Sequence, residues 1–394
     1  MNGTLRHVGL LALSSLSLLL VACPEPEAED TSSGSETTDG DTTAAPTDSG
    51  STGSTGSSSD SSTSTVDSSS TGEDTTTGTV EPRSWVLVGN TRGDDVIRID
   101  AETGLIDGTM VAAGTGGLYH PDTLLIRDGM LYVASGDTPE TSAILRFDAT
   151  TGDLVDTFIM GGGLHRPYGF AFGGDGMIYV ASFLTDELLR YDDTTGDFVD
   201  VFASGDGMPG GLNGPNDVKL GPDGALYVST QGSVAMDGMP TFPGLPSEVL
   251  RFDLGTGQST VHVQQPTPLP DSLGFVSMLG VAFGPDCDGG ACDLYTTDFA
   301  GGLRRHDAMG AVVWEVSTSY VMGAATGALA FGSDGEIYVP AFDTADDTGP
   351  GVLLRFDAAT GDPLPGDGLS GAIFVGPDSA LVRPIGVAFV VEPQ

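Results

Sequence analysis

The chain has 394 residues and carries 55 acidic against 14 basic side chains, a formal net charge of −41 at pH 7. The basic side chains are too few to neutralise a phosphate backbone, and nucleic acid is therefore excluded as a partner. The acidic surface would instead attract divalent cations. Simple solubility of an exported acidic protein is the alternative reading of this charge.

Residues 1–22 have the pattern of a bacterial export signal. A short basic stretch precedes an apolar run over 8–21, which is too short to span a bilayer. The segment 20–23, Leu-Val-Ala-Cys, resembles a lipobox, and this resemblance implies cleavage before Cys23 and lipidation of that cysteine. An ordinary secretory signal followed by a chance cysteine is the alternative. The residue after the cysteine is Pro24 and not Asp, which resembles the pattern of lipoproteins sent to the outer membrane. We therefore expect the protein in the cell envelope, on the periplasmic face or the cell surface.

Residues 23–82 continue as a polar segment rich in Ser, Thr, Gly and Asp. After the cysteine it contains 13 acidic residues and no basic one. Such a composition cannot bury enough apolar surface to offset chain entropy. We predict a disordered tether with an average span of about 40 to 50 Å, and no sequence-specific binding role for it.

A tripeptide of the form Arg-x-Asp recurs six times from there on, at intervals of 44 to 61 residues, and each copy closes a short apolar run. The copies are Arg98-Ile99-Asp100, Arg146-Phe147-Asp148, Arg190-Tyr191-Asp192, Arg251-Phe252-Asp253, Arg305-His306-Asp307 and Arg355-Phe356-Asp357. Thr-Gly follows five of the six within four residues. Six copies of a unit of about 50 residues predict a repeat fold. We expect the repeated Arg and Asp to form ion pairs between units or to anchor turns.

Each unit also contains an inner strand, an Asp-Gly turn and a second strand centred on Tyr. The third unit shows this over 166–172, Asp175-Gly176 and 177–180; Asp-Gly supplies the positive φ of a tight hairpin. The first unit, from Trp85, lacks an inner strand, but residues 383–389 match 166–172. We therefore predict that the C-terminal strand completes blade one and closes a ring without free sheet edges.

These features resemble six-bladed β-propellers of the NHL-repeat and SMP-30/gluconolactonase-like kind. The resemblance covers residues 83–394 and implies an all-β fold of six four-stranded blades around a central channel. It is specific for the architecture and weak for any one activity.

Two cysteines lie close together in the fifth unit, in a turn that is longer than its counterparts. In an exported protein, Cys287 and Cys292 predict a disulfide. A calcium site at Asp286, Asp288 and Asp293 is the alternative, but the run lacks the spacing and terminal Glu of an EF-hand loop.

Alignment of the inner strands places one side chain per blade toward the channel. These residues are Asp122, Tyr168, Asn216, Leu279, Gly327 and Ile385. The stretch 215–224 is similar to the Asn-Asp-Gly-Lys-Val-Asp-Pro-x-Gly segment of SMP-30-like lactonases, where the Asn binds a divalent cation that polarises a lactone or phosphoester. The similarity implies a site for calcium or another divalent cation at Asn216, Asp217 and Asp122. Leu279 and Ile385 leave that site incomplete, and ordinary turn chemistry is the preferred explanation of Asn216 and Asp217.

Other catalytic arrangements receive less support. His120 and His165 lie near inner-strand entries, but neither has a nucleophile close in sequence, and the Trp-Phe-Thr-Glu motif of streptogramin-lyase-like propellers is absent. We therefore do not predict streptogramin-lyase activity for this chain. His306 replaces an aromatic residue of the repeat and is expected to pack in the core, while His262 lies in a polar outer strand.

Long insertions at 135–143, 231–247, 264–277 and 342–351 are predicted to emerge on one rim. Apolar residues within them could wall the channel mouth: Met236, Met239, Phe242, Leu245 and Phe275. Loops held by a rigid scaffold often bind ligands, although solvent-exposed padding is the alternative. The sequence favours a lipid-anchored, monomeric binding or scaffold module for a protein, glycan or small molecule. The alternative function is a metal-dependent lactonase or esterase with its site at the channel.

Overall fold

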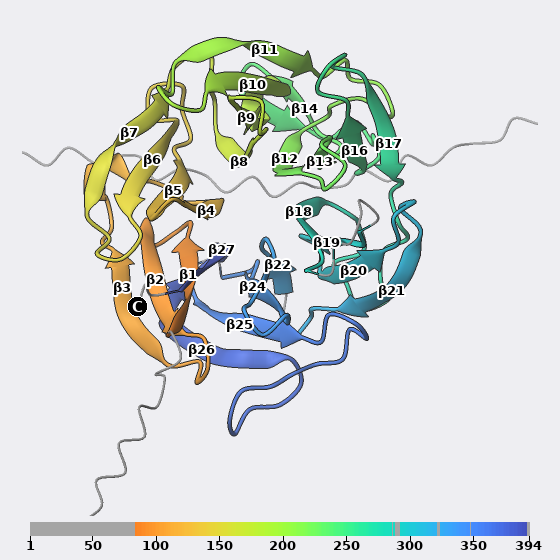
Figure 1. Ribbon diagram of the computed structural model, residues 1–394. Helices are drawn as coiled ribbons and strands as arrows, with labels where there is room; N and C mark the ends of the chain where they lie inside the picture. Colours follow the sequence, from red (N-terminus) through yellow and green to blue (C-terminus); the bar gives the residue numbers. More distant parts are fainter. Residues whose placement is uncertain (1–82, 286, 288–291, 321–323, 347, 392–394) are drawn as a thin grey trace, which may run out of the picture. The chain divides into compact units, whose positions relative to one another are not determined.

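The computed structural model describes residues 83–285, 287, 292–320, 324–346 and 348–391. In this part of the chain, six antiparallel sheets surround a central opening, and Figure 1 shows them as the blades of a ring. The predicted all-β propeller is therefore confirmed. The strands, from the channel outward, are β27 (Pro384–Val391), β1 (Ser84–Asn90), β2 (Asp95–Asp100) and β3 (Ile106–Val111) in blade one; β4 (Leu124–Arg127), β5 (Met130–Ser135), β6 (Ala143–Asp148) and β7 (Leu154–Met160) in blade two; β8 (Pro167–Phe172), β9 (Met177–Ser182), β10 (Glu187–Asp192) and β11 (Phe198–Ser204) in blade three.

The other three blades follow the same order. They comprise β12 (Pro215–Leu220), β13 (Leu226–Thr230), β16 (Val249–Phe252) and β17 (Ser259–Val263) in blade four; β18 (Met278–Phe283), β19 (Leu294–Asp298), β20 (Gly302–His306) and β21 (Val312–Ser317) in blade five; and β22 (Ala324–Thr326) with β23 (Ala330–Phe331), then β24 (Ile337–Asp343), β25 (Pro350–Phe356) and β26 (Ile373–Val382) in blade six. A small hairpin, β14 (Val234–Met236) and β15 (Met239–Thr241), rises between β13 and β16. Two short 3-10 turns, η1 (Thr115–Gly117) and η2 (Phe183–Thr185), complete the elements.

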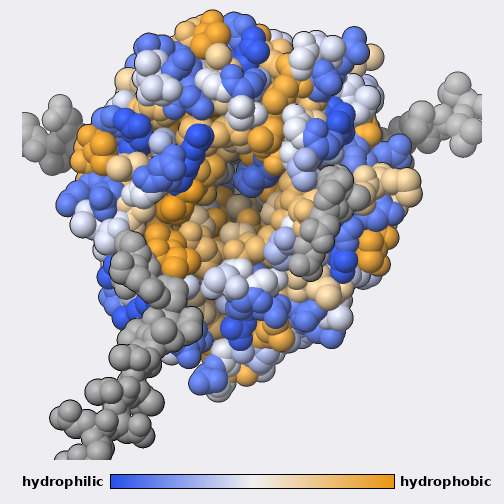
Figure 2. Space-filling view, viewed as in Figure 1, coloured by the Kyte–Doolittle hydropathy of each residue, from blue (hydrophilic) through white to orange (hydrophobic). Residues whose placement is uncertain are grey.

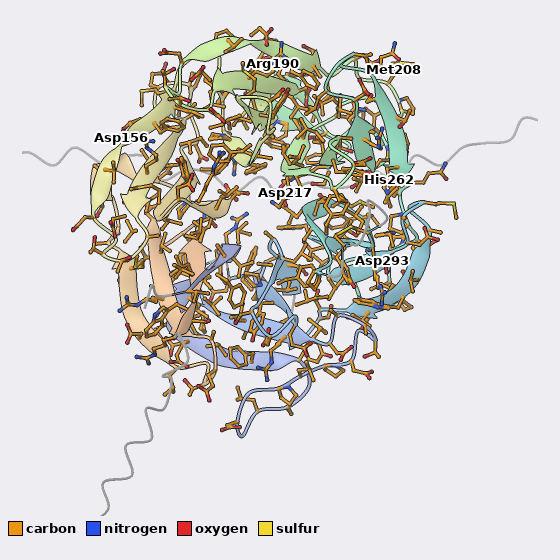
Figure 3. All side chains as sticks on the ribbon, in the orientation of Figure 1. Asp156, Arg190, Met208, Asp217, His262 and Asp293 are labelled. Atoms are coloured by element: carbon orange, nitrogen blue, oxygen red, sulfur yellow. A yellow bond between two sulfur atoms is a disulfide. The ribbon has the colours of Figure 1, made fainter. Side chains whose placement is uncertain are left out.

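The side chains of the repeated Arg-x-Asp units form contacts that hold the strands and turns of one blade together. Each Asp anchors the turn that follows its strand; for example, Asp148 Oδ1 accepts hydrogen bonds from the N–H groups of Thr150 and Thr151, both at 2.9 Å. Arg146 donates to Asp156 at 2.8 and 2.5 Å, within the same blade. The equivalent pair of Arg190 with Asp200 is also within one blade. Figure 3 shows Asp156 and Arg190 in the outer parts of their blades. The turn-anchor prediction is confirmed, whereas the prediction of ion pairs between blades is wrong for these arginines.

Arg305 is the repeat arginine that reaches the next blade. It pairs with Asp293 of its own blade and also donates to the backbone oxygen of Ala359 in blade six at 2.8 Å. The following residue, His306, is fully buried and lies 3.0 Å from the hydroxyl of Thr296. Burial lowers the pKa of His306 to about 4, so the neutral ring packs in the core as predicted.

The ring closes through the C-terminal strand. β27 pairs with β1 over seven residue pairs, from Ser84 with Val391 to Asn90 with Pro384. The side chain of Asn90 adds to the closure, since its Nδ2 donates to Ala380 O at 2.7 Å and its Oδ1 accepts from Val382 N at 3.1 Å. The predicted completion of blade one by the C-terminus is confirmed.

The cysteine pair forms the predicted disulfide, with the two Cα atoms of Cys287 and Cys292 separated by 4.8 Å. Asp293, from the alternative calcium site, pairs with Arg305 instead, and Asp286 and Asp288 lie outside the described residues. Cys23 and the predicted signal peptide and tether also lie outside them. Over the described ranges, no helix has the length and apolar character needed to cross a membrane.

Candidate functional site at the channel mouth

The loops after the second and fourth strands of each blade emerge together, because successive strands alternate in direction. We call this side of the ring the long-loop face. On this face, the chain enters the inner strands of blades one to four through a residue with positive φ that is followed by proline. These residues are His120 (φ 49°), Arg166 (φ 55°), Gly214 (φ 62°) and Arg383 (φ 47°). Proline disfavours the right-handed helical region for the residue before it. A left-handed conformation is strained for the three that are not glycine, and such strain concentrates at functional sites.

Asp137, from the loop between β5 and β6, joins two of these strained residues. Its carboxylate lies 2.7 Å from His120 Nδ1 and 3.4 Å from Arg166 Nε. Its backbone oxygen lies 3.0 Å from His165 Nε2, so His165 fixes the loop. Burial favours a higher pKa for Asp137, but the His120 hydrogen bond and the Arg166 charge outweigh it and lower the pKa. Arg92 lies on the other side of the His120 ring, with its Nη1 3.3 Å from His120 Nε2.

Asp122 and Tyr168 lie next to this group on the first positions of the channel wall. Both keep limited access to solvent. Loss of hydration raises the pKa of Asp122 to about 7, although the charges of Arg166 and Arg383 act against it. Burial likewise raises the pKa of Tyr168 to about 12. Loss of hydration therefore favours the neutral carboxyl form of Asp122 relative to an exposed aspartate.

The two predicted metal ligands of blade four have different surroundings. Asn216 is 6% exposed, and its Nδ2 has no hydrogen-bond partner among the described residues. Asp217 is fully engaged: Oδ1 lies 2.6 Å from Lys219 Nζ, and Oδ2 accepts from Val281 N of blade five at 2.9 Å. Figure 3 shows Asp217 beside the central opening. The carboxylate thus connects two inner strands.

This donor set does not fit a divalent cation well, because such ions prefer six or more oxygen ligands. Of the predicted ligands, Asp217 is held by an ammonium group and a backbone amide. No group of three or more His, Cys, Asp or Glu side chains within the described ranges converges on one point. A metal at Asn216, Asp217 and Asp122 stays a prediction, and no chemical step is derived from it.

Further along the inner strands the channel becomes apolar. A cavity of about 260 Å³ is lined by Leu124, Ala282, Ala328, Val387 and other small or apolar residues, with Lys219 as its charged side chain. Figure 2 shows a central hollow bordered by hydrophobic residues. The channel therefore has a polar end at the long-loop face and an apolar interior.

The predicted apolar rim is exposed. Met236 is 59%, Met239 66%, Phe242 53% and Phe275 45% exposed, and Leu245 is half-buried. Two exposed apolar residues that the sequence analysis missed, Met208 and Leu273, lie in adjoining loops. Hydrogen bonds connect the loops that carry these residues: Asp186 accepts from Gly214 N and Ala235 N, and Ser247 N donates to the side chain of Gln265.

Sequence reasoning also missed Asp137, Arg166 and Arg383 as parts of the mouth. The signal was present in the dipeptides His120-Pro121, Arg166-Pro167 and Arg383-Pro384, which occupy the same position at three strand entries. Asp137 gives no comparable signal, since it lies in one of the long insertions, outside the aligned inner strands.

No protein-family model matches the sequence, and no match is found among curated proteins. Among solved structures, a chain of a nidogen/laminin complex is 12% identical, with a TM-score of 0.53 over 78% of this chain and 98% of that one. Virginiamycin B lyase from Staphylococcus aureus is 17% identical, with a TM-score of 0.45 over 78% and 88%. A candidate 6-phosphogluconolactonase from Bacteroides fragilis is 15% identical, with a TM-score of 0.48 over 79% and 99%. At 12% identity, the likeness to the nidogen/laminin chain concerns the fold alone, and it agrees with the strand order, which shows that the chain is a six-bladed β-propeller.

Proposed function

We infer that this protein is a binding module of the cell envelope whose long-loop face holds another protein through apolar side chains. The observation that carries this proposal is the exposed apolar rim. Its exposed residues are Met208, Met236, Met239, Phe242, Leu273 and Phe275. Large exposed apolar patches commonly mark interaction sites.

The composition of the rim favours a protein partner. Three of its six residues are methionines, whose flexible, polarisable side chains adapt to irregular apolar surfaces. The hairpin β14–β15 holds two of them, Met236 and Met239, and Asp186 pins its base through Ala235 N at 2.6 Å. A firmly held hairpin reduces the ordering cost of binding. No observation favours the metal-dependent hydrolase, since Asp217 is engaged between two strands.

Photo-crosslinking tests the rim. We expect p-benzoylphenylalanine in place of Met239 to give a discrete protein adduct in host envelopes, and the same group in place of Met309, which is 83% exposed, to give none. The further change Phe242→Ser is expected to reduce the adduct about tenfold, because one interface anchor contributes about 1 to 2 kcal/mol. Equal adducts at both positions, or no effect of Phe242→Ser, would contradict the proposal.

We also propose that Cys23 carries a lipid and that residues 24–82 tether the propeller to the membrane. Support comes from the lipobox-like segment 20–23 and from the acidic, polar composition after it. Cells fed labelled palmitate are expected to label the wild-type protein, while Cys23→Ala should lose the label. Label retained in Cys23→Ala would rule out this anchor.

A further inference from the structure

The cavity inside the channel has a wall of small and apolar side chains. Blades one, two, four, five and six contribute to it, and four of its lining residues are alanines: Ala282, Ala328, Ala330 and Ala388. Its volume of about 260 Å³ lies just below the roughly 300 to 1,000 Å³ of typical ligand pockets. Apolar cavities of this kind take up small apolar molecules, because such molecules gain contacts there and leave water. The cavity therefore suits a small ligand.

One ammonium group interrupts this apolar wall. Lys219, the only lysine in the chain, lies next to the end of β12 that is away from the long-loop face. Its side chain is 31% exposed, and its Nζ donates to Asp217 Oδ1 at 2.6 Å. An ammonium group has three N–H donors, and no other acceptor for Nζ occurs in the described part of the chain. Donors of Lys219 thus remain for a ligand in the cavity.

Asp217 determines which kind of polar group can bind beside Lys219. Its side chain is only 4% exposed, and it is held in place because Oδ1 accepts from Val218 N and Oδ2 from Val281 N, both at 2.9 Å. This fixed carboxylate orients Nζ and balances its charge. A second carboxylate would be repelled by Asp217 and by the net charge of −41 on the chain. An uncharged acceptor meets neither obstacle.

We propose that the channel cavity binds a small uncharged apolar molecule with one carbonyl oxygen, which accepts a hydrogen bond from Lys219 Nζ. A carbonyl oxygen only accepts hydrogen bonds and an ammonium group only donates them, so the two are matched. The bond is charge-assisted and forms next to an apolar wall, where few other polar side chains compete; Thr123 supplies a hydroxyl group there. This site lies inside the channel, is separate from the apolar rim and does not depend on the proposed protein partner.

Nuclear magnetic resonance of the full chain carrying isotope-labelled lysine tests the proposal, because the single lysine gives a single ε-methylene signal. Acetophenone, cumene and benzoate are probes of similar shape: cumene has a methyl group in place of the carbonyl oxygen, and benzoate has a charged oxygen in place of the methyl group. We expect acetophenone to shift the Lys219 signal and to bind about tenfold more tightly than cumene, since it gains a hydrogen bond to a charged donor. Benzoate should bind more weakly than acetophenone.

Two variants separate the hydrogen bond from the apolar wall. Lys219→Met keeps a long side chain but removes the donors, so acetophenone should lose about tenfold in affinity while cumene binds as before. Ala330→Leu fills part of the cavity, and both compounds should bind at least tenfold more weakly to it. Ala113→Leu, at an exposed alanine away from the cavity lining, is the matched control and should bind both as the wild type does.

The outcomes that contradict the proposal are distinct. If none of the three compounds shifts the Lys219 signal at the limit of its solubility, the channel holds only water and the proposal is overturned. Equal affinities for acetophenone and cumene would exclude the hydrogen bond, and tighter binding of benzoate would exclude an uncharged ligand. If Lys219→Met does not fold, the shift in the wild type and the comparison of Ala330→Leu with Ala113→Leu still decide.

Discussion

Removal of residues 383–394 is expected to abolish cooperative unfolding of the propeller. The deletion takes away β27, whose Ile385, Val387 and Ala388 are buried, and leaves the edge of β1 without its partner. We expect the loss of this burial and of seven residue pairs to exceed the net stability of a typical domain, about 5 to 15 kcal/mol. Urea unfolding followed by the fluorescence of Trp85, which pairs with Val390 across this junction, measures the effect directly.

Two point variants separate closure of the ring from a general loss of chain. Val387→Asp places a charge at a site that is 6% exposed, whereas Val391→Asp changes a residue of the same strand that is 48% exposed. We expect the first to cost several kcal/mol and the second about 0.5 kcal/mol or less. If the shortened chain unfolds with the same midpoint and the same urea dependence as the full chain, β27 does not close the ring.

Repetition made the architecture predictable from the sequence. Six Arg-x-Asp copies give the blade number, and the match of residues 383–389 to 166–172 gives the closure, because equivalent positions in a repeat obey the same packing rules. Cys287 and Cys292 were predictable for a similar reason, since their short separation leaves little choice of partner.

The partners of the repeated arginines were harder to predict. Arg146 pairs with Asp156 on the neighbouring strand β7, and this depends on register and on the bulge between Arg146 and Phe147. The register between β6 and β7 cannot be read from the sequence alone. Asp217 illustrates the same limit: its position next to Asn216 suggests a metal ligand, but a cross-blade bond to Val281 N uses its carboxylate.

The channel mouth could be found only in part from the sequence. The inner-strand alignment identifies Asp122, Tyr168 and Asn216 as channel-facing, since they occupy equivalent positions. Asp137 comes from an irregular loop, and the convergence of Arg166 and Arg383 depends on left-handed backbone conformations. These features follow from ring geometry and loop paths, which a repeat pattern leaves open.

The spacing of the inner strands depends on glycines at which a side chain would clash. A Cβ atom on Gly386 would lie 1.9 Å from the backbone oxygen of Asp122 in blade two. On Gly169, it would lie 2.5 Å from the backbone oxygen of Asn216 in blade four. Neighbouring blades therefore approach at backbone distance around the channel, and glycine permits this because it has no side chain.

Gly386→Ala is accordingly expected to destabilise the propeller by about 3 kcal/mol or more, because the backbone of a packed strand must move to admit one methyl group. Gly376→Ala is the matched control: its Cβ would lie 3.7 Å from Leu369 at the nearest, and we expect a change of about 0.5 kcal/mol or less. Thermal and urea unfolding of both variants provide the measurement. Equal stability of the two variants would show that the blades have room to separate.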